Sequence, residues 1–432
     1  MTNNFFKKYI EKPTESQALN TKAVLLSSGT DVDFDSFRTI PHISEEFRVV
    51  SERAVVSDRS DIEPKSQKRQ YIPDEILVGV GADTSVVKVC YSPKSLLTLV
   101  ADNDEVHIVD KETKKPFPIS VSLIKKPNYS YRKFEDGIPF GKYTSIVGLD
   151  RVTVIPYDGC FHWMDGKPCC FCGGNPTRLG FDGAKPNLFE AEGTCNRNYK
   201  KWWAEKREKT IERVRTSMQA LLETDYPKPH FHFLINGGNL PDVDFEWEVF
   251  FEVLDALNDV VPFGKIDSGS SIIPPSDLNL VDELKERYSF DNIAFNLEVW
   301  GEQDFKEVCP GKSFYGFNNF VEALRYAVST FGRGNVRTNF VLGAQSIEKT
   351  IQGVKELAVI GVVPDYSIFY PRPASIWNKK QPPSPDEILY FGYKVDEIYK
   401  QYGFRPVYCM LSSRSSIANE VGDLNGRIPV RI

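Results

Sequence analysis

The sequence contains no run of about 18 apolar residues, the length that a helix needs to cross a membrane. Residues 1–8 lack the long apolar core and the small-residue cleavage site of a secretory signal. Neither sign of charge dominates, because 53 Lys and Arg stand against 59 Asp and Glu, for a net charge of −6. We therefore expect a cytoplasmic protein with no membrane association and no general nucleic-acid binding.

The cysteines are few but concentrated. Four of the eight fall within thirteen residues, namely Cys160, Cys169, Cys170 and Cys172. The cytoplasm keeps thiols reduced, so we interpret this cluster as ligands rather than as disulfides. Cys90, Cys309 and Cys409 stand alone, and we expect them to be small buried side chains.

Apolar patterns divide the chain of 432 residues into four predicted parts. Residues 1–70 are a polar, loop-like or mobile segment, and residues 71–148 form a small β-rich accessory domain. Residues 149–376 alternate strand and helix signals, which predicts an α/β fold with parallel strands, a partial (β/α)6 TIM-like barrel. Residues 377–432 form a C-terminal α/β extension. In such barrels the chemistry takes place at the carboxyl ends of the strands, and the cysteine cluster follows the first strand.

Three interpretations of the cysteine cluster compete. A structural zinc site would use Cys160, His162, Cys169 and Cys172. A thioredoxin-like redox pair would use Cys169 and Cys172 alone, but it leaves the other cysteines and the two glycines that follow without a role. The third interpretation is an iron–sulfur cluster held by only three protein thiolates.

The Cys-Cys-Phe-Cys stretch that ends at Cys172 resembles the signature of the radical S-adenosylmethionine (SAM) enzymes. That signature has three cysteines spaced by three and then two residues, with an aromatic residue directly before the third. The first gap is longer here, since eight residues separate Cys160 from Cys169. The resemblance implies that Cys160, Cys169 and Cys172 hold a [4Fe–4S] cluster with one iron open to SAM. Cys170 is an alternative ligand, which the position of Phe171 disfavours.

Further segments extend the resemblance over residues 149–375. Residues 237–239 occupy the place of the family's Gly-Gly-Glu stretch, whose carbonyl groups receive the SAM amino group. Residues 296–298 resemble the Asn-Leu-Glu motif of the biotin synthase and lipoyl synthase branch, whose side chains meet the ribose or the methionine part of SAM. Residues 343–348 match the Gly-x-x-x-x-Glu pattern of the fifth strand, where a glycine passes close to adenine. The residues implied in SAM binding are therefore Gly237, Gly238, Asn239, Asn296, Glu298, Gly343 and Glu348.

The resemblance implies an enzyme that cleaves SAM reductively to a 5′-deoxyadenosyl radical. The radical would abstract hydrogen from a small molecule or a short peptide, leading to rearrangement, elimination, epimerisation or coupling. It also implies a flavodoxin- or ferredoxin-type electron donor. The alternatives are a SAM-dependent methyl or sulfur transferase of the same superfamily, or a non-catalytic zinc-binding protein. The C-terminal part has no second cysteine cluster, which argues against auxiliary iron–sulfur centres.

A few other residues are candidates for the site. His232 shares a strand face with His230 and would touch substrate if that face lines the barrel. Cys195 is a candidate hydrogen donor to a product radical. Arg337 and Arg372 follow the pattern of side chains that pair with a carboxylate or a phosphate.

Overall fold

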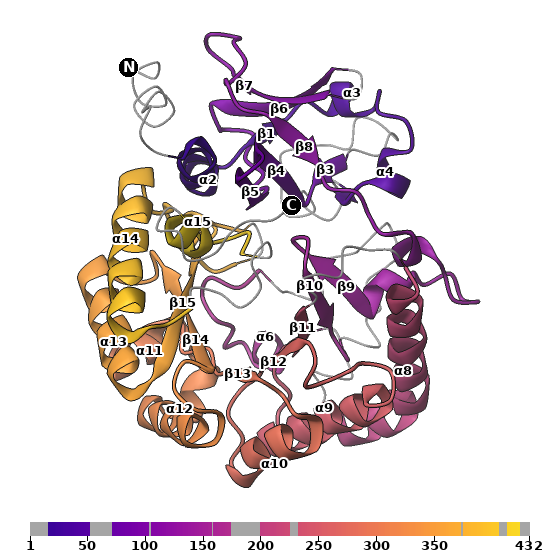
Figure 1. Ribbon diagram of the computed structural model, residues 1–432, viewed down its shortest axis with the longest axis vertical. Coiled ribbons are helices and arrows are strands. Elements are labelled where there is room, and N and C mark those ends of the chain that lie inside the picture. The colour runs from indigo at the N-terminus through magenta and orange to yellow at the C-terminus, as the bar shows by residue number, and fades with distance from the viewer. Residues whose placement is uncertain are drawn as a thin grey trace.

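Six parallel strands form most of the largest sheet in the computed structural model (Figure 1). The structure describes residues 16–51, 71–102, 105–157, 159–173, 199–224, 232–372, 375–405 and 413–423. The six strands pair in chain order, and β9 (Thr144–Val147) adds an antiparallel edge next to the first of them. They are β10 (Arg151–Val154), β11 (His232–Asn236), β12 (Asp267–Ser271), β13 (Asn292–Ala294), β14 (Val336–Leu342) and β15 (Val362–Ile368).

A long helix separates each of these strands from the next, and one more follows the last. These helices are α8 (Tyr199–Leu222), α9 (Val243–Leu257), α10 (Asn279–Tyr288), α12 (Phe317–Phe331), α13 (Ile347–Ile360) and α14 (Pro385–Tyr402). Helical crossovers between parallel strands place the helices on the outer face, as Figure 1 shows. In the described part of the chain β15 and β9 are the two ends of the sheet, so the barrel is open between them. The predicted partial (β/α)6 barrel is confirmed.

The limits of α14 follow directly from its sequence. Ser384 precedes the helix, and its hydroxyl accepts a hydrogen bond from the Glu387 N–H at 3.3 Å. The Glu387 carboxylate in turn accepts one from the Ser384 N–H at 2.7 Å, which completes a capping box with proline in the first turn. Gly403 ends the helix in the left-handed conformation, with φ of 69°. Local capping residues therefore account for both ends of this helix.

A second, six-stranded sheet is made by the N-terminal part of the chain, in the order β1-β6-β7-β8-β4-β5. It lies over the open side of the barrel in Figure 1. On one side the Gly148 N–H, before β10, donates to the buried Glu75 carboxylate of β4 at 3.1 Å. On the other side the Lys88 N–H of β5 donates to the Arg414 carbonyl at 3.0 Å, and the Ile368 N–H of β15 donates to the Ser415 carbonyl at 2.8 Å. The N-terminal sheet is thus bonded to both edges of the barrel. Its strands are β1 (Asp31–Val32), β4 (Glu75–Val80), β5 (Asp83–Lys88), β6 (Leu97–Asp102), β7 (Glu105–Asp110) and β8 (Val121–Leu123).

The described part of residues 1–70 differs from the expected polar or mobile segment. Helix α2 (Gln17–Ser28) is buried along most of its length and packs between β5 and α14. Even Lys22 is only 1% exposed, and it pairs with Glu420 at 2.6 Å. The helix escaped prediction because it is covered on several sides, so its sequence has no single apolar face with a helical period.

The remaining elements are short. They are α3 (Phe34–Phe37), α4 (Ile43–Glu46), β2 (Val49–Ser51), β3 (Tyr71–Pro73), α6 (Phe161–Met164), α11 (Glu302–Val308), α15 (Ala418–Asp423) and the 3-10 helices η1 (Asn128–Tyr131), η2 (Phe140–Lys142) and η4 (Lys312–Phe314). None of the helices within the described ranges combines the length and the apolar character of a bilayer span.

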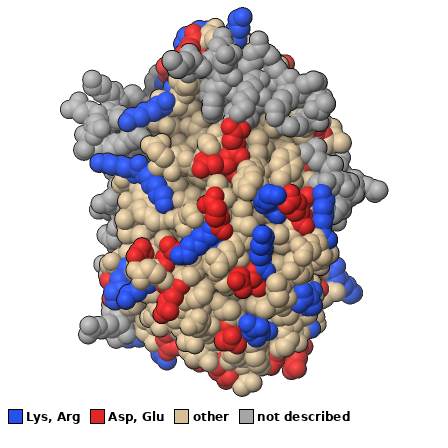
Figure 2. Space-filling model, turned by 90° about the vertical axis from the view of Figure 1, so that its left-hand side faces the viewer, with Lys and Arg blue, Asp and Glu red and all other residues tan. Residues whose placement is uncertain are grey.

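The outer face that carries α13 and α14 has charges of both signs. Figure 2 shows Lys and Arg interspersed with Asp and Glu across it, without a broad area of one sign. Some of these charges are paired along α14, for example Lys394 with Glu397 at 2.8 Å. Such exposed pairs contribute little to stability, about 0.3–0.5 kcal/mol each, and they indicate a solvated surface.

Candidate active site at the barrel mouth

The loop that follows β10 carries Cys160, Cys169 and Cys172 across the carboxyl ends of the strands. Three backbone hydrogen bonds hold it against the loops that follow other strands. The Phe161 N–H donates to the Asn239 carbonyl beyond β11 at 2.8 Å. The Cys170 N–H donates to the Val308 carbonyl beyond β13 at 2.8 Å, and the Trp377 N–H beyond β15 donates to the Cys170 carbonyl at 3.0 Å. The cysteines therefore lie where the loops of a parallel barrel converge.

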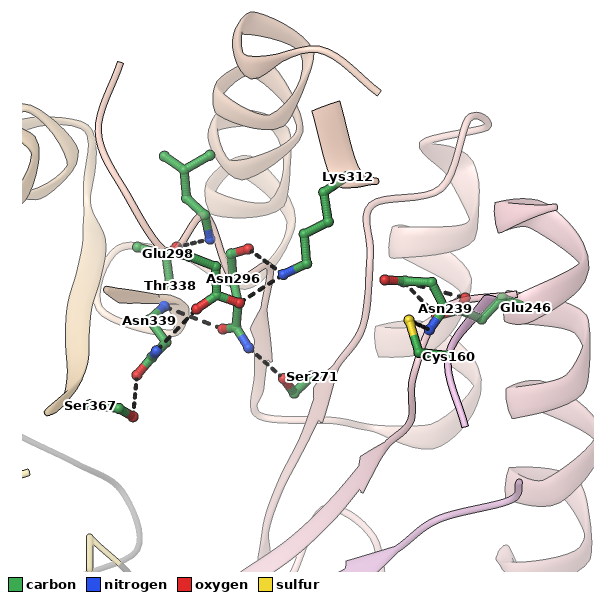
Figure 3. Close-up of polar contacts among 11 residues, drawn as sticks. Cys160, Asn239, Glu246, Ser271, Asn296, Glu298, Lys312, Thr338, Asn339 and Ser367 are labelled. Atoms are coloured by element: carbon green, nitrogen blue, oxygen red, sulfur yellow. Dashed lines mark hydrogen bonds and ion pairs between the residues drawn. The ribbon is translucent and has the colours of Figure 1, made fainter. Parts of the chain in front are cut away.

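The closest approach in this region is between Gly238 and the first cysteine. A methyl group added at Gly238 would lie 2.0 Å from the Gly159 carbonyl oxygen and 2.6 Å from Cβ of Cys160. The neighbouring Asn239 N–H donates to the Cys160 sulfur at 3.4 Å (Figure 3). Glycine is thus required at 238 because the backbone after β11 runs directly along the cysteine loop.

The three thiols differ in their electrostatic surroundings. Burial raises the pKa of Cys160 to about 12, although the Asn239 N–H favours its thiolate. Charges on Cys169 and Cys172 raise the pKa of Cys160 further. A hydrogen bond from the Cys309 thiol lowers the pKa of Cys169, against the effect of burial. Protein N–H and S–H donors directed at sulfur suit a thiolate-held metal group, whose binding would displace the remaining thiol protons.

Cys170 faces away from this group. Its thiol donates to the Glu307 carbonyl of α11 at 3.4 Å, and burial raises its pKa. In the described ranges, no three His, Cys, Asp or Glu side chains are arranged to bind a single metal ion. His162 belongs to the packing of the cysteine loop, because a methyl group at Gly311 would come within 2.3 Å of Cγ of its ring. Burial lowers the pKa of His162 to about 4, so its imidazole is neutral.

A cluster of polar side chains lies across the mouth from the cysteine loop, on the segment after β13. Lys312 extends toward Asn296 and Glu298 in Figure 3. Its ammonium group donates to the Glu298 carboxylate at 2.7 Å and to the Asn296 carbonyl at 3.1 Å. The buried Lys312 would lose its proton readily in isolation, but the charge of Glu298 raises its pKa instead. Lys312 therefore keeps its positive charge, close to Cys169 and Cys309.

The amides of Asn296 and Asn339 extend this group over neighbouring strands. Asn296 donates to the Ser271 hydroxyl of β12 at 2.9 Å and accepts from the Asn339 N–H of β14 at 3.2 Å. Asn339 donates to Glu298 at 3.3 Å and accepts from the Ser367 hydroxyl of β15 at 3.0 Å. Four strands or strand ends thus contribute to one polar network at the mouth (Figure 3). We call Ser271, Asn296, Glu298, Lys312, Asn339 and Ser367 the mouth network.

Glu298 has an unusual backbone. Its φ is 70°, in the left-handed region that a residue other than glycine rarely adopts. Its N–H donates to the Asn339 carbonyl and its carbonyl accepts from the Val341 N–H, both at 2.8 Å. These bonds hold a conformation that costs on the order of 1–3 kcal/mol, and such strain is concentrated at functional sites.

Glu246 of α9 supports the loop that faces Cys160. It is 1% exposed, accepts from the Leu240 N–H at 2.7 Å and lies 3.5 Å from the Asn239 amide nitrogen. Burial raises its pKa to about 8 despite these bonds, so the carboxyl group is largely protonated at neutral pH. The positive charge of Lys312 also lowers this pKa, but burial outweighs it.

Among the residues assigned to SAM, five meet at the mouth: Gly237, Gly238, Asn239, Asn296 and Glu298. Gly343 has φ of 95°, and a methyl group there would lie 2.8 Å from Pro383. Glu348 is different, because it is exposed on α13 and lines an outward-facing groove with Lys355 and Val359. The structure does not bring Glu348 to the five residues at the mouth.

The structure does not bring the other candidate residues together at the mouth. His232 begins β11, about 13 Å along the strand from its mouth end, and is fully buried. Burial and the charges of Arg151 and Arg337 hold its pKa well below the usual value. Arg337 forms a two-pronged ion pair with Asp365 at 2.5 and 2.6 Å. His230 and Cys195 lie outside the described residues.

Two residues were missed as parts of the site. Cys309 is fully buried, as its isolated position in the sequence predicts, but its thiol also contacts that of Cys169. Lys312 was given no role. The only sequence signal was the short spacing of the two on one loop, with Gly311 between them, after the motif that contains Glu298.

Comparisons with known proteins give partial similarity. No protein-family model matches the chain. Over 135 residues it is 30% identical to the bacteriochlorophyllide c C-7(1)-hydroxylase of Chlorobaculum limnaeum, which covers 31% of this chain and 33% of that protein. The chain thus spans about a third of the length of this curated relative.

Two solved structures show a distant likeness. A radical SAM methyltransferase from Sphaerobacter thermophilus is 14% identical with a TM-score of 0.39, over 72% of this chain and 76% of that one. Coproporphyrinogen III oxidase (HemN) from Escherichia coli, a radical SAM enzyme, is 13% identical with a TM-score of 0.38, over 60% and 54% of the two chains. Because these sequence identities and TM-scores are low, a functional proposal has to rest on this chain's own residues.

Proposed function

We propose that this protein is a radical SAM enzyme whose active site is the barrel mouth. The supporting observation is the contact between the cysteine loop and the Gly237–Gly238–Asn239 backbone, with the mouth network on the neighbouring strands. Cys160, Cys169 and Cys172 would hold a [4Fe–4S] cluster. A placement in the biotin synthase and lipoyl synthase branch rests on the Asn296–Glu298 motif alone.

When bound, the cluster would supply the electron that cleaves SAM, and the resulting 5′-deoxyadenosyl radical would take hydrogen from the substrate. The protein's part is to hold and orient the reactants. The Asn239 N–H stabilises the Cys160 thiolate, and the Cys309 thiol does the same for Cys169. Glu298 and Asn296 present carboxylate and amide oxygens at the position where the ribose or the methionine part of SAM is expected.

The substrate that we propose is a small molecule or a short peptide, and the electron donor a flavodoxin- or ferredoxin-type protein. The N-terminal sheet covers the open side of the barrel, which supports a reaction kept apart from solvent. The partial relative is named a hydroxylase, and hydroxylation also acts on a C–H bond.

The test is anaerobic purification followed by incubation with SAM and a chemical reductant. We expect a brown, iron-containing protein that releases 5′-deoxyadenosine, and we expect Cys160→Ala, Cys169→Ala and Cys172→Ala each to lose iron and activity. Cys170→Ala is the matched control, since the Cys170 thiol donates a hydrogen bond to the Glu307 carbonyl of α11. A colourless protein with stoichiometric zinc would refute the proposal. Release of S-adenosylhomocysteine would instead identify a methyl transferase.

A further inference from the structure

The N-terminal sheet meets the barrel mouth at the end of β5. A methyl group added at Gly29 would lie 2.2 Å from the Tyr370 hydroxyl, beyond β15, and 2.6 Å from the Cys90 carbonyl oxygen. Lys88, two residues before Cys90, donates its backbone N–H to the carbonyl of Arg414. Three segments that are far apart in sequence therefore join here: the end of β5, the segment after β15 and the C-terminal segment.

Three positive side chains come together at this junction, and only one of them is neutralised. Arg414 pairs with Asp74 at 2.7 Å and with Glu75 at 3.3 Å. Within the described residues, the side chains of Lys88 and Arg372 have no hydrogen-bond or ion-pair partner. The other groups near Lys88 do not supply an anion, because burial raises the pKa of the Cys90 thiol and Asp74 is engaged with Arg414.

The two unpaired charges repel each other. The positive charge of Arg372, followed by burial and the charge of Arg414, lowers the pKa of Lys88 to about 7. Lys88 is half-buried and Arg372 is exposed. Asp74 is the nearby counter-charge, but Arg414 shares it. The repulsion between Lys88 and Arg372 disfavours the folded state, and a bound ligand of opposite charge would relieve it.

This pair lies beside the cysteine loop. A methyl group added at Gly173, the residue after Cys172, would lie 2.6 Å from Cδ and 2.9 Å from Cβ of Arg372. The aliphatic part of Arg372 therefore packs on the backbone that follows the third cysteine. Arg372 therefore brings a positive charge next to the segment that follows the third cysteine.

We propose that Lys88 and Arg372 bind an anionic oxygen group, a carboxylate or a phosphate, of the substrate that reacts at the barrel mouth. This inference rests on the proposed function, because the bound molecule is a substrate only if a reaction takes place at the barrel mouth. It makes the N-terminal sheet part of the substrate site. Arg offers a planar fork that bonds two oxygens of such a group, and Lys adds a point charge from the other side.

The experiment is thermal unfolding of the full chain, anaerobically and without SAM. Sodium phosphate and sodium succinate are titrated in turn and compared with sodium chloride at equal ionic strength. We expect one or both oxyanions to raise the Tm of the wild type above the chloride value. Phosphate alone would indicate a phosphorylated substrate, and succinate alone a carboxylate.

The variants decide the location of binding. Lys88→Met and Arg372→Gln should each weaken the apparent anion affinity about tenfold or more, whereas Lys88→Arg should retain it. Lys88→Met should also raise the Tm without anion, because it removes the repulsion. Lys355→Met on the outer side of α13 is the matched control and should respond like the wild type. If Arg372→Gln fails to fold, the Lys88 variants suffice.

An unchanged anion response in Lys88→Met would overturn the inference, as would a wild type that responds to no oxyanion. The proposed function is tested separately by 5′-deoxyadenosine release from the wild type. SAM cleavage without an anion response removes only the inference. An anion response without SAM cleavage leaves the anion site and removes its link to a radical reaction.

Discussion

Alanine at position 238 should separate the cysteine loop from the loop after β11. The added methyl group would lie 2.0 Å from the Gly159 carbonyl oxygen, whereas a carbon–oxygen contact needs about 3.3 Å. The two backbones must therefore move apart by about 1.3 Å, and no side-chain rotation can relieve the contact. Metal ligands tolerate displacements of only about 0.2 Å, so Cys160 would no longer be in place.

Gly237→Ala is the matched control for this change. Its methyl group would lie 3.3 Å from the ring of Tyr157, a contact that a shift of only a few tenths of an ångström would relieve. Both substitutions restrict the unfolded chain equally, which by itself stabilises by about 0.4–1 kcal/mol. The difference between them therefore isolates the close approach of the two backbones.

We expect Gly238→Ala to lose about 1–3 kcal/mol of unfolding free energy in urea, the usual cost of overpacking. It should also retain little iron after anaerobic reconstitution, whereas Gly237→Ala should keep wild-type iron and stability. Should Gly238→Ala hold a full complement of iron and unfold within about 0.5 kcal/mol of the wild type, the proposed contact at Cys160 would be wrong.

Three further substitutions test the groups around the thiols. Lys312→Met should cost about 3–5 kcal/mol in urea unfolding, because it leaves Glu298 buried without its cation, and adding Glu298→Gln should restore most of the loss; full stability of the single variant would contradict the pairing. Glu246 has a folded-state pKa of about 8 against 4.5 for the unfolded chain, so it contributes stability at low pH that is lost as the pH rises through this window. Glu246→Gln should therefore flatten the fall in stability between pH 4.5 and 8, and an unaltered pH profile would count against a buried neutral acid. Cys309→Ala should raise the pKa of Cys169 and slow its alkylation in the metal-free protein, whereas Cys309→Ser keeps a donor; equal rates in all three proteins would rule out the thiol–thiol bond.

The sequence by itself was sufficient for the barrel and for its cysteine loop. The order of strands and helices from β10 to α14 follows from alternating patterns, and α14 from local capping residues. The positions of Cys160, Cys169 and Cys172 after the first strand, and of Asn296 and Glu298 after the fourth, then place them at one end of the barrel. Parallel topology brings strand ends together whatever the intervening residues are.

Other features were decided only by the tertiary structure. Helix α2 is buried on several sides, so it has no periodic pattern to detect. Cys309 and Lys312 became part of the site through contacts with Cys169 and Glu298, which no spacing along the chain encodes. Arg372 was a candidate partner of an anion from its sequence, but Lys88 lies 284 positions away and only the fold brings the two charges near each other. Helix caps and apolar periods depend on residues that are close in the sequence. The electrostatic potential at a site depends instead on all the charges that the fold places within a few ångströms.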